Sequence, residues 1–281
     1  MGLRAALVQL NSSDDPAANL PVTLDYLRKA AAGGAQIALT PEMTNCVSSS
    51  RVHQQVVLQH ESDDITLAAL RQAAQDLGIW VVIGSLALKT DDSDGRFANR
   101  SFLISPLGAI VARYDKVHMF DVQVSETESY RESSGFRPGT QAVLADTALA
   151  CIGLSICYDL RFAYLYRALA QGGAEILTVP AAFSPVTGAA HWDVLLRARA
   201  IETGCFVLAP AQTGQHATTQ GHARQTYGHS MAVAPWGEIL LDMGTEPGVG
   251  LVTIDLDRIV GARNRIPALF HDRSLQGPAQ P

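Results

Sequence analysis

The order of the apolar segments predicts an α/β fold with two mixed sheets covered by helices. Short segments with strand character alternate with longer segments whose apolar residues recur at helical spacing. The alternation occurs twice, and each time two strand-like segments follow that are joined by turn sequences at 105–108 and 234–237. No linker rich in Pro, Gly or Ser separates the halves, so we expect one domain over residues 1–281.

The first half supplies the elements of one such unit. The segment 16–33 has apolar residues three and four apart, such as Leu20, Leu24 and Leu27, and Gly33 is a stop signal. A long polar stretch at the end of this half is typical of a functional loop. In order, we expect a strand at 4–10, a helix at 16–33, a strand at 36–40, a helix at 62–77, a strand at 80–88, a hairpin at 100–104 and 109–114, and a loop at 117–140.

The second half repeats the scheme. Its apolar runs again end where helical spacing begins. We expect strands at 151–156, 175–179 and 205–210, helices at 160–171 and 190–202, a polar loop at 212–226, a hairpin at 228–233 and 238–241, a strand at 250–254, a short helix from 255, and an irregular tail at 266–281.

The composition excludes several classes of function. Of the 281 residues 47% are hydrophobic and 17% charged, so a large core can form. The net charge is −6 without a basic run, which argues against nucleic-acid binding. No segment reaches the roughly 20 apolar residues of a membrane span. The start is too short an apolar run for a signal peptide, so we expect a cytoplasmic protein with no membrane partner.

Neither the cysteines nor the histidines form a metal-binding pattern. No two cysteines have C-x-x-C spacing, so neither a disulfide scaffold nor a zinc site is expected. The histidines of the second polar loop and the strand after it lack the spacing of a helical metal pair. These residues are Cys46, Cys151, Cys157 and Cys205, and His216, His222 and His229. We expect reduced thiols, no metal and no organic cofactor.

Cys157 is the first candidate for catalysis. It ends an apolar strand, and a segment of helical character begins just after it. The unpaired N–H groups of a helix N-terminus favour negative charge, so this position predicts a thiol with a lowered pKa. Glu42 and Lys116 also follow predicted strands, and the ends of neighbouring strands gather ligands in α/β folds.

These residue types together suit acyl transfer. Glu42 can take the proton of the Cys157 thiol and later give it to a leaving amine. Lys116 and the backbone N–H of Tyr158 can stabilise an oxyanion. Taken singly, each residue has an ordinary alternative, because a cysteine after a strand is often inert core, a glutamate caps or solvates a loop, and a lysine lies on the surface. The same alternative holds for Glu132 in the long loop.

The chain resembles the nitrilase superfamily of carbon–nitrogen hydrolases along nearly its whole length. Four blocks carry the resemblance, Leu39–Met43, Tyr114–Phe120, Ile156–Phe162 and Tyr227–Ser230, in matching order and spacing. The resemblance implies a four-layer α-β-β-α sandwich and a catalytic set of Glu42, Lys116 and Cys157. It also implies that Glu132 positions the substrate and supports the lysine, and that the chain forms a homodimer or a higher homo-oligomer with 266–281 at the interface.

Within the superfamily, the segment from Phe183 through Thr187 to Trp192 is similar to the amidase branch. The segments 211–216 and 227–231 are similar to those of deaminated glutathione amidases. This implies a small carboxylate-bearing amide as substrate, hydrolysed through a thioester to 2-oxoglutarate and Cys-Gly. Arg161 either orients nearby carboxylates or binds the substrate carboxylate. Phe183 and Thr187 are expected in the pocket wall.

Three alternatives stay open at this point. The chain departs from many relatives at Ala163-Tyr164 and Gly188-Ala189, near the expected pocket, which leaves the exact substrate open. An ω-amidase acting on 2-oxoglutaramate and an N-carbamoyl amino-acid amidohydrolase use the same chemistry. A non-catalytic binding protein on the same scaffold is the alternative of another class.

Overall fold

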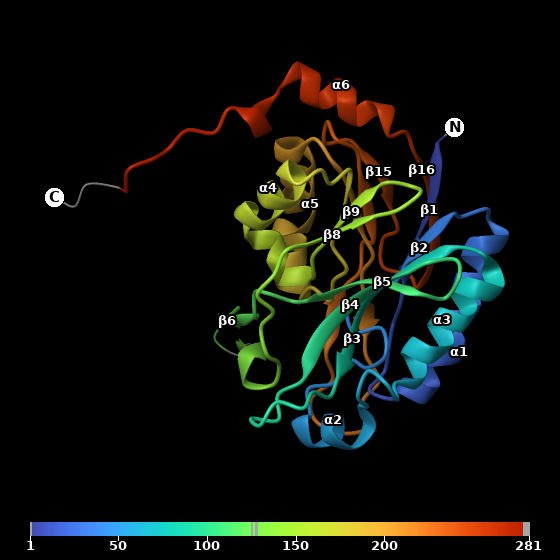
Figure 1. Cartoon of the computed structure of the whole chain (residues 1–281). Coiled ribbons are helices and arrows are strands. Elements are labelled where there is room, and N and C mark those ends of the chain that lie inside the picture. Colours follow the sequence, from blue (N-terminus) through green and yellow to red (C-terminus); the bar gives the residue numbers. More distant parts are fainter. Residues whose placement is uncertain (1, 125, 127–128, 278–281) are drawn as a thin grey trace.

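A computed structural model, which describes residues 2–124, 126 and 129–277, contains two six-stranded sheets packed face to face (Figure 1). The first sheet has the order β16-β1-β2-β3-β4-β5 and the second the order β15-β14-β11-β10-β9-β8. In each sheet three neighbouring strands are parallel and the remaining neighbours are antiparallel. The predicted fold class, an α/β sandwich of two mixed sheets, is confirmed.

The first sheet forms from both ends of the chain, because its last strand pairs with its first. Its strands are β1 (Leu3–Gln9), β2 (Ile37–Leu39), β3 (Trp80–Leu88), β4 (Ala98–Ile104), β5 (Ile110–Asp115) and β16 (Gly248–Ile254). The second sheet consists of β8 (Val143–Asp146), β9 (Cys151–Leu154), β10 (Ile176–Thr178), β11 (Phe206–Ala209), β14 (Met231–Val233) and β15 (Ile239–Asp242).

Helices cover the outer face of each sheet, which gives four layers (Figure 1). On the first sheet lie α1 (Pro16–Ala32) and α3 (Ile65–Leu77), and on the second α4 (Ala163–Gln171) and α5 (Pro185–Thr203). Asp15 and Asp64 cap the first pair with side-chain hydrogen bonds, and Gly78 ends α3 in the left-handed conformation. The helix α6 (Asp257–Arg265) lies at the end of the sandwich.

Alternation along β1 shows how the layers are made. Leu3, Ala5 and Leu7 belong to the core that includes both sheets, whereas Ala6 and Val8 pack in the core with α1 and α3. Successive strand side chains point to opposite faces, so a strand between two apolar layers is apolar throughout. The nearly unbroken apolar runs of the sequence follow from this burial on both sides.

Several elements differ from the expected ones. The helix α5 begins at Pro185 and not at 190, because Ser184 caps it, and His191 therefore lies in its second turn rather than at its start. Sequence analysis missed α2 (Arg51–Val57), the edge strand β8 and two small ribbons. The ribbons are β6 (Asp121–Gln123) with β7 (Ser129–Arg131), and β12 (Thr213–Gln215) with β13 (Gln225–Tyr227). Among the described residues no helix has the length and apolar character needed to cross a membrane.

Candidate active site

The three candidate residues come from both sheets. Glu42 follows β2, Lys116 directly follows β5, and Cys157 lies three residues beyond β9. Gly84, at a bulge of β3, lets the segments after β2 and β10 approach closely, because a Cβ there would lie 2.0 Å from the Thr40 carbonyl oxygen and 2.5 Å from Pro180. The site therefore forms where the ends of parallel strands of two sheets meet.

The Glu42 carboxylate is almost fully buried and receives three hydrogen bonds. Its Oε1 accepts from Lys116 Nζ and from Asn99 Nδ2, each at 2.9 Å, and its Oε2 accepts from the Ala182 N–H at 2.9 Å. The Cys157 thiol lies near enough to this carboxylate for each to affect the pKa of the other. Glu42 is thus fixed between the thiol and a cation.

Lys116 lies between two carboxylates. Its Nζ is 2.9 Å from Glu42 Oε1 and 2.9 Å from Glu132 Oε2. Glu132 is fixed in turn by the Phe120 N–H at 2.7 Å and by Asn99 Nδ2 at 3.3 Å. The long loop after β5 therefore brings Glu132 to the site that the sequence assigned to it.

Cys157 stands in a tight turn. Its φ is +51°, a left-handed conformation that is costly for any residue with a Cβ. Asp159 holds the turn, since its Oδ2 accepts from the Ile156 N–H at 2.8 Å and from the Tyr114 hydroxyl at 2.7 Å. Its Oδ1 accepts from the His118 N–H at 3.0 Å. The first turn of a short 3-10 helix (Cys157–Arg161) follows, so the Tyr158 N–H points out of a helix N-terminus.

The pKa values define the resting protonation state. Burial raises the pKa of Glu42, but the charges of Lys116 and Arg224 outweigh this and hold the pKa below its usual value. Burial and the Glu42 charge raise the pKa of the Cys157 thiol well above its usual value. Burial lowers the pKa of Lys116, yet Glu132 and Glu42 raise it overall. The resting site thus holds a carboxylate, an ammonium and a neutral thiol.

The expectation of a lowered thiol pKa is therefore wrong. The helix N-terminus is present, but it belongs to a single short turn, and the thiol is 7% exposed beside a carboxylate. Removal of water and the adjacent negative charge both disfavour the thiolate. A thiol in these surroundings stays neutral unless a base removes its proton.

Aromatic rings cluster around Tyr158, the residue that follows Cys157. The Tyr158 ring lies 5.0 Å from that of Phe120 and 5.4 Å from that of Phe162. Phe120 also lies 5.0 Å from Tyr130. These contacts join the segment after Cys157 to the loop that carries Glu132.

The other sequence candidates are Phe183, Arg161 and Thr187, and the Arg161 guanidinium lies 5.9 Å from the Tyr158 ring. Phe183 is buried against Trp192 with ring centroids 4.9 Å apart, and the Arg161 guanidinium lies 5.7 Å from the Phe183 ring. Arg161 Nη2 is 3.3 Å from His191 Nδ1 and has no carboxylate partner among the described residues. Thr187 is half-buried in the first turn of α5, where its N–H bonds to Ser184.

The comparisons with known proteins agree with this geometry. The family model described as carbon-nitrogen hydrolase matches residues 4–264. A deaminated glutathione amidase from Yersinia enterocolitica is 39% identical over 269 residues, which cover 95% of this chain and 92% of the relative. The chain belongs to the carbon-nitrogen hydrolase family.

Solved structures place this carbon-nitrogen hydrolase in the nitrilase superfamily. The Caenorhabditis elegans NitFhit protein superposes with a TM-score of 0.88 and 32% identity over 97% of this chain and 66% of that longer chain. A glutamate-to-glutamine variant of the amidase from Nesterenkonia sp. AN1 has a TM-score of 0.76 and 26% identity, over 94% of each chain. That structure holds an acetamide moiety on its active-site cysteine.

Sequence analysis of the hydrolase missed two site residues. Asn99, a buried polar residue near the start of β4, bridges Glu42 and Glu132. Arg224, in the second polar loop, donates from Nη2 to the Ala182 carbonyl oxygen at 2.7 Å, and its charge acts on Glu42. The sequence signal for these two residues was weak. Asn99 is a single asparagine in a strand, and Arg224 is a single arginine in a long loop.

The remaining histidines do not gather around a metal. No group of three or more His, Cys, Asp or Glu side chains in the described part of the hydrolase is arranged to hold one. His216 is buried between the Ser12 carbonyl oxygen at 2.7 Å and the Thr226 hydroxyl at 2.8 Å, and burial lowers its pKa to about 4. It is a neutral structural residue of the loop.

Proposed function

We propose that this carbon-nitrogen hydrolase is a cysteine amidase. Glu42 takes the thiol proton of Cys157 as the sulfur attacks the amide carbon. Lys116 and the Tyr158 N–H stabilise the oxyanion of the tetrahedral intermediate. Glu42 then gives the proton to the leaving nitrogen, the C–N bond breaks, and an acyl thioester remains on Cys157.

The second half of the reaction restores the enzyme. Glu42 takes a proton from water, whose oxygen attacks the thioester carbon. The C–S bond breaks, the free acid leaves, and Glu42 returns the proton to the sulfur. Glu132 and Asn99 keep Lys116 and Glu42 in place through both steps. The proposed reaction uses no cofactor.

One observation carries this proposal, namely the buried group of Cys157, Glu42 and Lys116, in which Lys116 Nζ donates to Glu42 Oε1 at 2.9 Å and the charge of Glu42 acts on the thiol. A carboxylate that is ionised beside a protonated thiol is a general base poised for one proton transfer. The solved amidase with a modified active-site cysteine supports the same assignment for Cys157.

We propose deaminated glutathione as the substrate, which the enzyme would cleave to 2-oxoglutarate and Cys-Gly. The relative from Yersinia enterocolitica carries that activity in its name. Two arginines without carboxylate partners among the described residues, Arg161 and Arg224, lie near the site and suit a substrate with carboxylates. 2-Oxoglutaramate and N-carbamoyl amino acids are the competing substrates.

The decisive experiment compares kcat/KM for these three substrates, with intact mass recorded during turnover. A preference for deaminated glutathione and a thioester adduct on Cys157 are expected. Cys157→Ala is expected to be inactive, and full turnover by this variant would end the proposal. Absence of hydrolysis with every amide, and no alkylation of Cys157, would favour a binding protein on this scaffold.

We also propose that the chain works as a single-domain homodimer in the cytoplasm. An apolar groove between the end of α5 and α6 contains Trp236 and continues onto Phe270, which is 81% exposed. Such a surface suits a second copy, with 266–281 at the contact; residues 278–281 lie outside the described part. The four free cysteines suit a reducing compartment. Sedimentation of wild type and Phe270→Glu tests the dimer, since loss of self-association is expected in the variant.

A further inference from the structure

Arg224 has a guanidinium group with unused hydrogen-bonding capacity. Its Nη2 donates to the Ala182 carbonyl oxygen at 2.7 Å, while its Nε is buried without a partner. Its guanidinium carbon lies 5.7 Å from the centre of the Tyr130 ring. No carboxylate among the described residues pairs with it. A buried donor without an acceptor is costly, and a ligand oxygen would remove that cost.

Two other arginines with little exposure, Arg199 and Arg100, have carboxylate partners. Arg199 donates from Nε to the Leu160 carbonyl oxygen at 2.9 Å and from Nη1 to Glu202 at 2.6 Å. Arg100 binds Asp115 through Nε at 2.6 Å and Glu61 through Nη1 at 2.7 Å. A pairing of this kind is what Arg224 lacks, and a planar guanidinium matches a carboxylate with two parallel hydrogen bonds.

The position of Arg224 relates it to one half of the substrate. It binds the carbonyl oxygen of Ala182, whose N–H in turn binds Glu42 Oε2 at 2.9 Å. Glu42 delivers the proton to the leaving nitrogen in the proposed reaction, so Arg224 lies on the leaving-group side. Arg161 belongs to the short helix that begins at Cys157, and the acyl group is assigned to its side.

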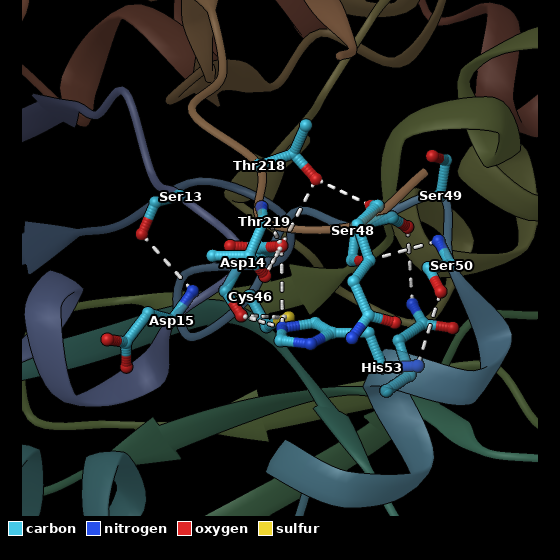
Figure 2. Close-up of polar contacts among 12 residues, drawn as sticks. Ser13, Asp14, Asp15, Cys46, Ser48, Ser49, Ser50, His53, Thr218 and Thr219 are labelled. Carbon is cyan, nitrogen blue, oxygen red and sulfur yellow. Dashed lines mark hydrogen bonds and ion pairs between the residues drawn. The ribbon is translucent and has the colours of Figure 1, made fainter. Parts of the chain in front are cut away.

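The loop that carries Arg224 is held firmly by residues distant in the sequence. Asp14 Oδ2 accepts from the Thr219 N–H at 2.7 Å and from the Thr218 hydroxyl at 3.1 Å (Figure 2). The Ser49 hydroxyl donates to the His222 carbonyl oxygen at 2.8 Å. A side chain on a loop fixed in this way is preorganised, which reduces the entropy lost on binding.

The charges of the site are consistent with a second cation for the substrate. Glu42 and Glu132 face one ammonium, Lys116, and the thiol is neutral, so these four groups carry one negative charge. A substrate with a carboxylate at each end is repelled unless cations lie near both ends. Arg161 and Arg224 supply two such cations, one from the short helix after Cys157 and one from the second polar loop.

We propose that Arg224 binds a carboxylate on the leaving amine and so makes the enzyme select amides of carboxylate-bearing amines over primary amides. The inference rests on the proposed amidase function and adds to it the recognition of the leaving group. In deaminated glutathione the group recognised is the glycine carboxylate of the departing Cys-Gly.

The test measures a ratio. The probes are 2-oxoglutaramyl-Cys-Gly and the same compound with its glycine carboxylate capped as an amide. Wild type is expected to prefer the free carboxylate by about 10- to 100-fold in kcat/KM, the range for a hydrogen bond to a charged group. In Arg224→Gln the ratio is expected to fall to within about 3-fold of unity, and Arg224→Lys to lie between.

Arg161→Gln is the matched control. It is expected to lower kcat/KM for both compounds and to keep the wild-type ratio. A wild-type ratio near one, or an unchanged ratio in Arg224→Gln, overturns the assignment of Arg224 while the amidase function stands. Hydrolysis of neither compound by wild type refutes the proposed substrate, and the role of Arg224 with it. The wild-type ratio stays informative even if Arg224→Gln does not fold.

Discussion

Oε1 of Glu42 lies 2.9 Å from Nζ of Lys116, and the two side chains are only 4% and 2% exposed. This pair determines where the protons of the site reside. The lysine keeps the glutamate ionised in surroundings that would otherwise protonate it, and the glutamate keeps the neighbouring thiol protonated. The proposed base and the proposed nucleophile therefore rest in the protonation states from which one proton transfer makes a thiolate.

Replacing Glu42 by Gln separates these two effects. Loss of the general base is expected to lower kcat by about 10²- to 10⁴-fold. The pKa of Cys157 is expected to fall, because the negative charge that raises it is gone while Lys116 remains. Alkylation rates measured against pH, with the modified cysteine identified by mass spectrometry, report this pKa. An unchanged or higher midpoint in Glu42→Gln would contradict the electrostatic account.

Activity is expected to be nearly constant between about pH 5 and 9. The pKa of Glu42 lies below 4.5, so the carboxylate persists until the pH falls through that lowered value. The pKa of Cys157 lies well above 9.0, so the thiol does not ionise on its own in this range. The pH profile of kcat/KM measures both limits. A limb between pH 6 and 8 on a non-titrating substrate would show that another group controls the reaction.

Lys116→Met is expected to destabilise the fold at neutral pH by about 3–5 kcal/mol, because two carboxylates lose the cation between them. The pKa of Glu42 is then expected to rise above its usual value, so part of the lost stability returns as the pH falls. Urea unfolding at pH 7 and pH 5 measures both the loss of stability and its partial return.

Lys29→Met is the matched control, since Lys29 is exposed and pairs with Asp25 on the surface of α1. The unfolding midpoint of this variant is expected to stay at the wild-type value. Equal effects of the two substitutions would show that the buried pair is not important for stability.

Much of the fold was predictable because its sheets are buried on both sides. Apolar runs such as those of β3 and β9 mark strands whatever lies around them. The edge strand β8 was missed because its apolar run, Val143-Leu144-Ala145, is short, and only Ala145 of it is buried. The pairing of β16 with β1 depends on contacts between residues about 250 apart, which no local pattern encodes.

The candidate site, too, could be predicted only in part. Glu42, Lys116 and Cys157 could be proposed because each follows a strand and has reactive chemistry, and the structure brings them together with Glu132. The thiol pKa could not be predicted, since it depends on burial and on the distance to a carboxylate from another sheet. Asn99 and Arg224 were missed because single polar residues have no pattern until the fold places them.

The last prediction concerns the contact between Asp14 and the loop at 216–224. Asp14 is buried, and hydrogen bonds from Thr219 and Thr218 lower its pKa although burial raises it. Asp14→Asn removes the charge and an acceptor, which leaves loop donors unsatisfied at a cost of about 1–3 kcal/mol. The loop is then expected to open more often, with faster tryptic cleavage after Arg224 and a smaller preference for a carboxylate-bearing leaving group.

Limited proteolysis with mass mapping measures the first effect, and kcat/KM for the free and capped substrates measures the second. Asp63→Asn is the matched control, because Asp63 is exposed before α3 and has no side-chain hydrogen bond within the described chain. Faster cleavage with an unchanged substrate preference would mean that the loop is anchored by Asp14 but does not position Arg224. Unchanged cleavage would mean that the contacts independent of the Asp14 carboxylate, such as those of Ser49 with His222 and of His216 with Ser12, are sufficient to hold the loop.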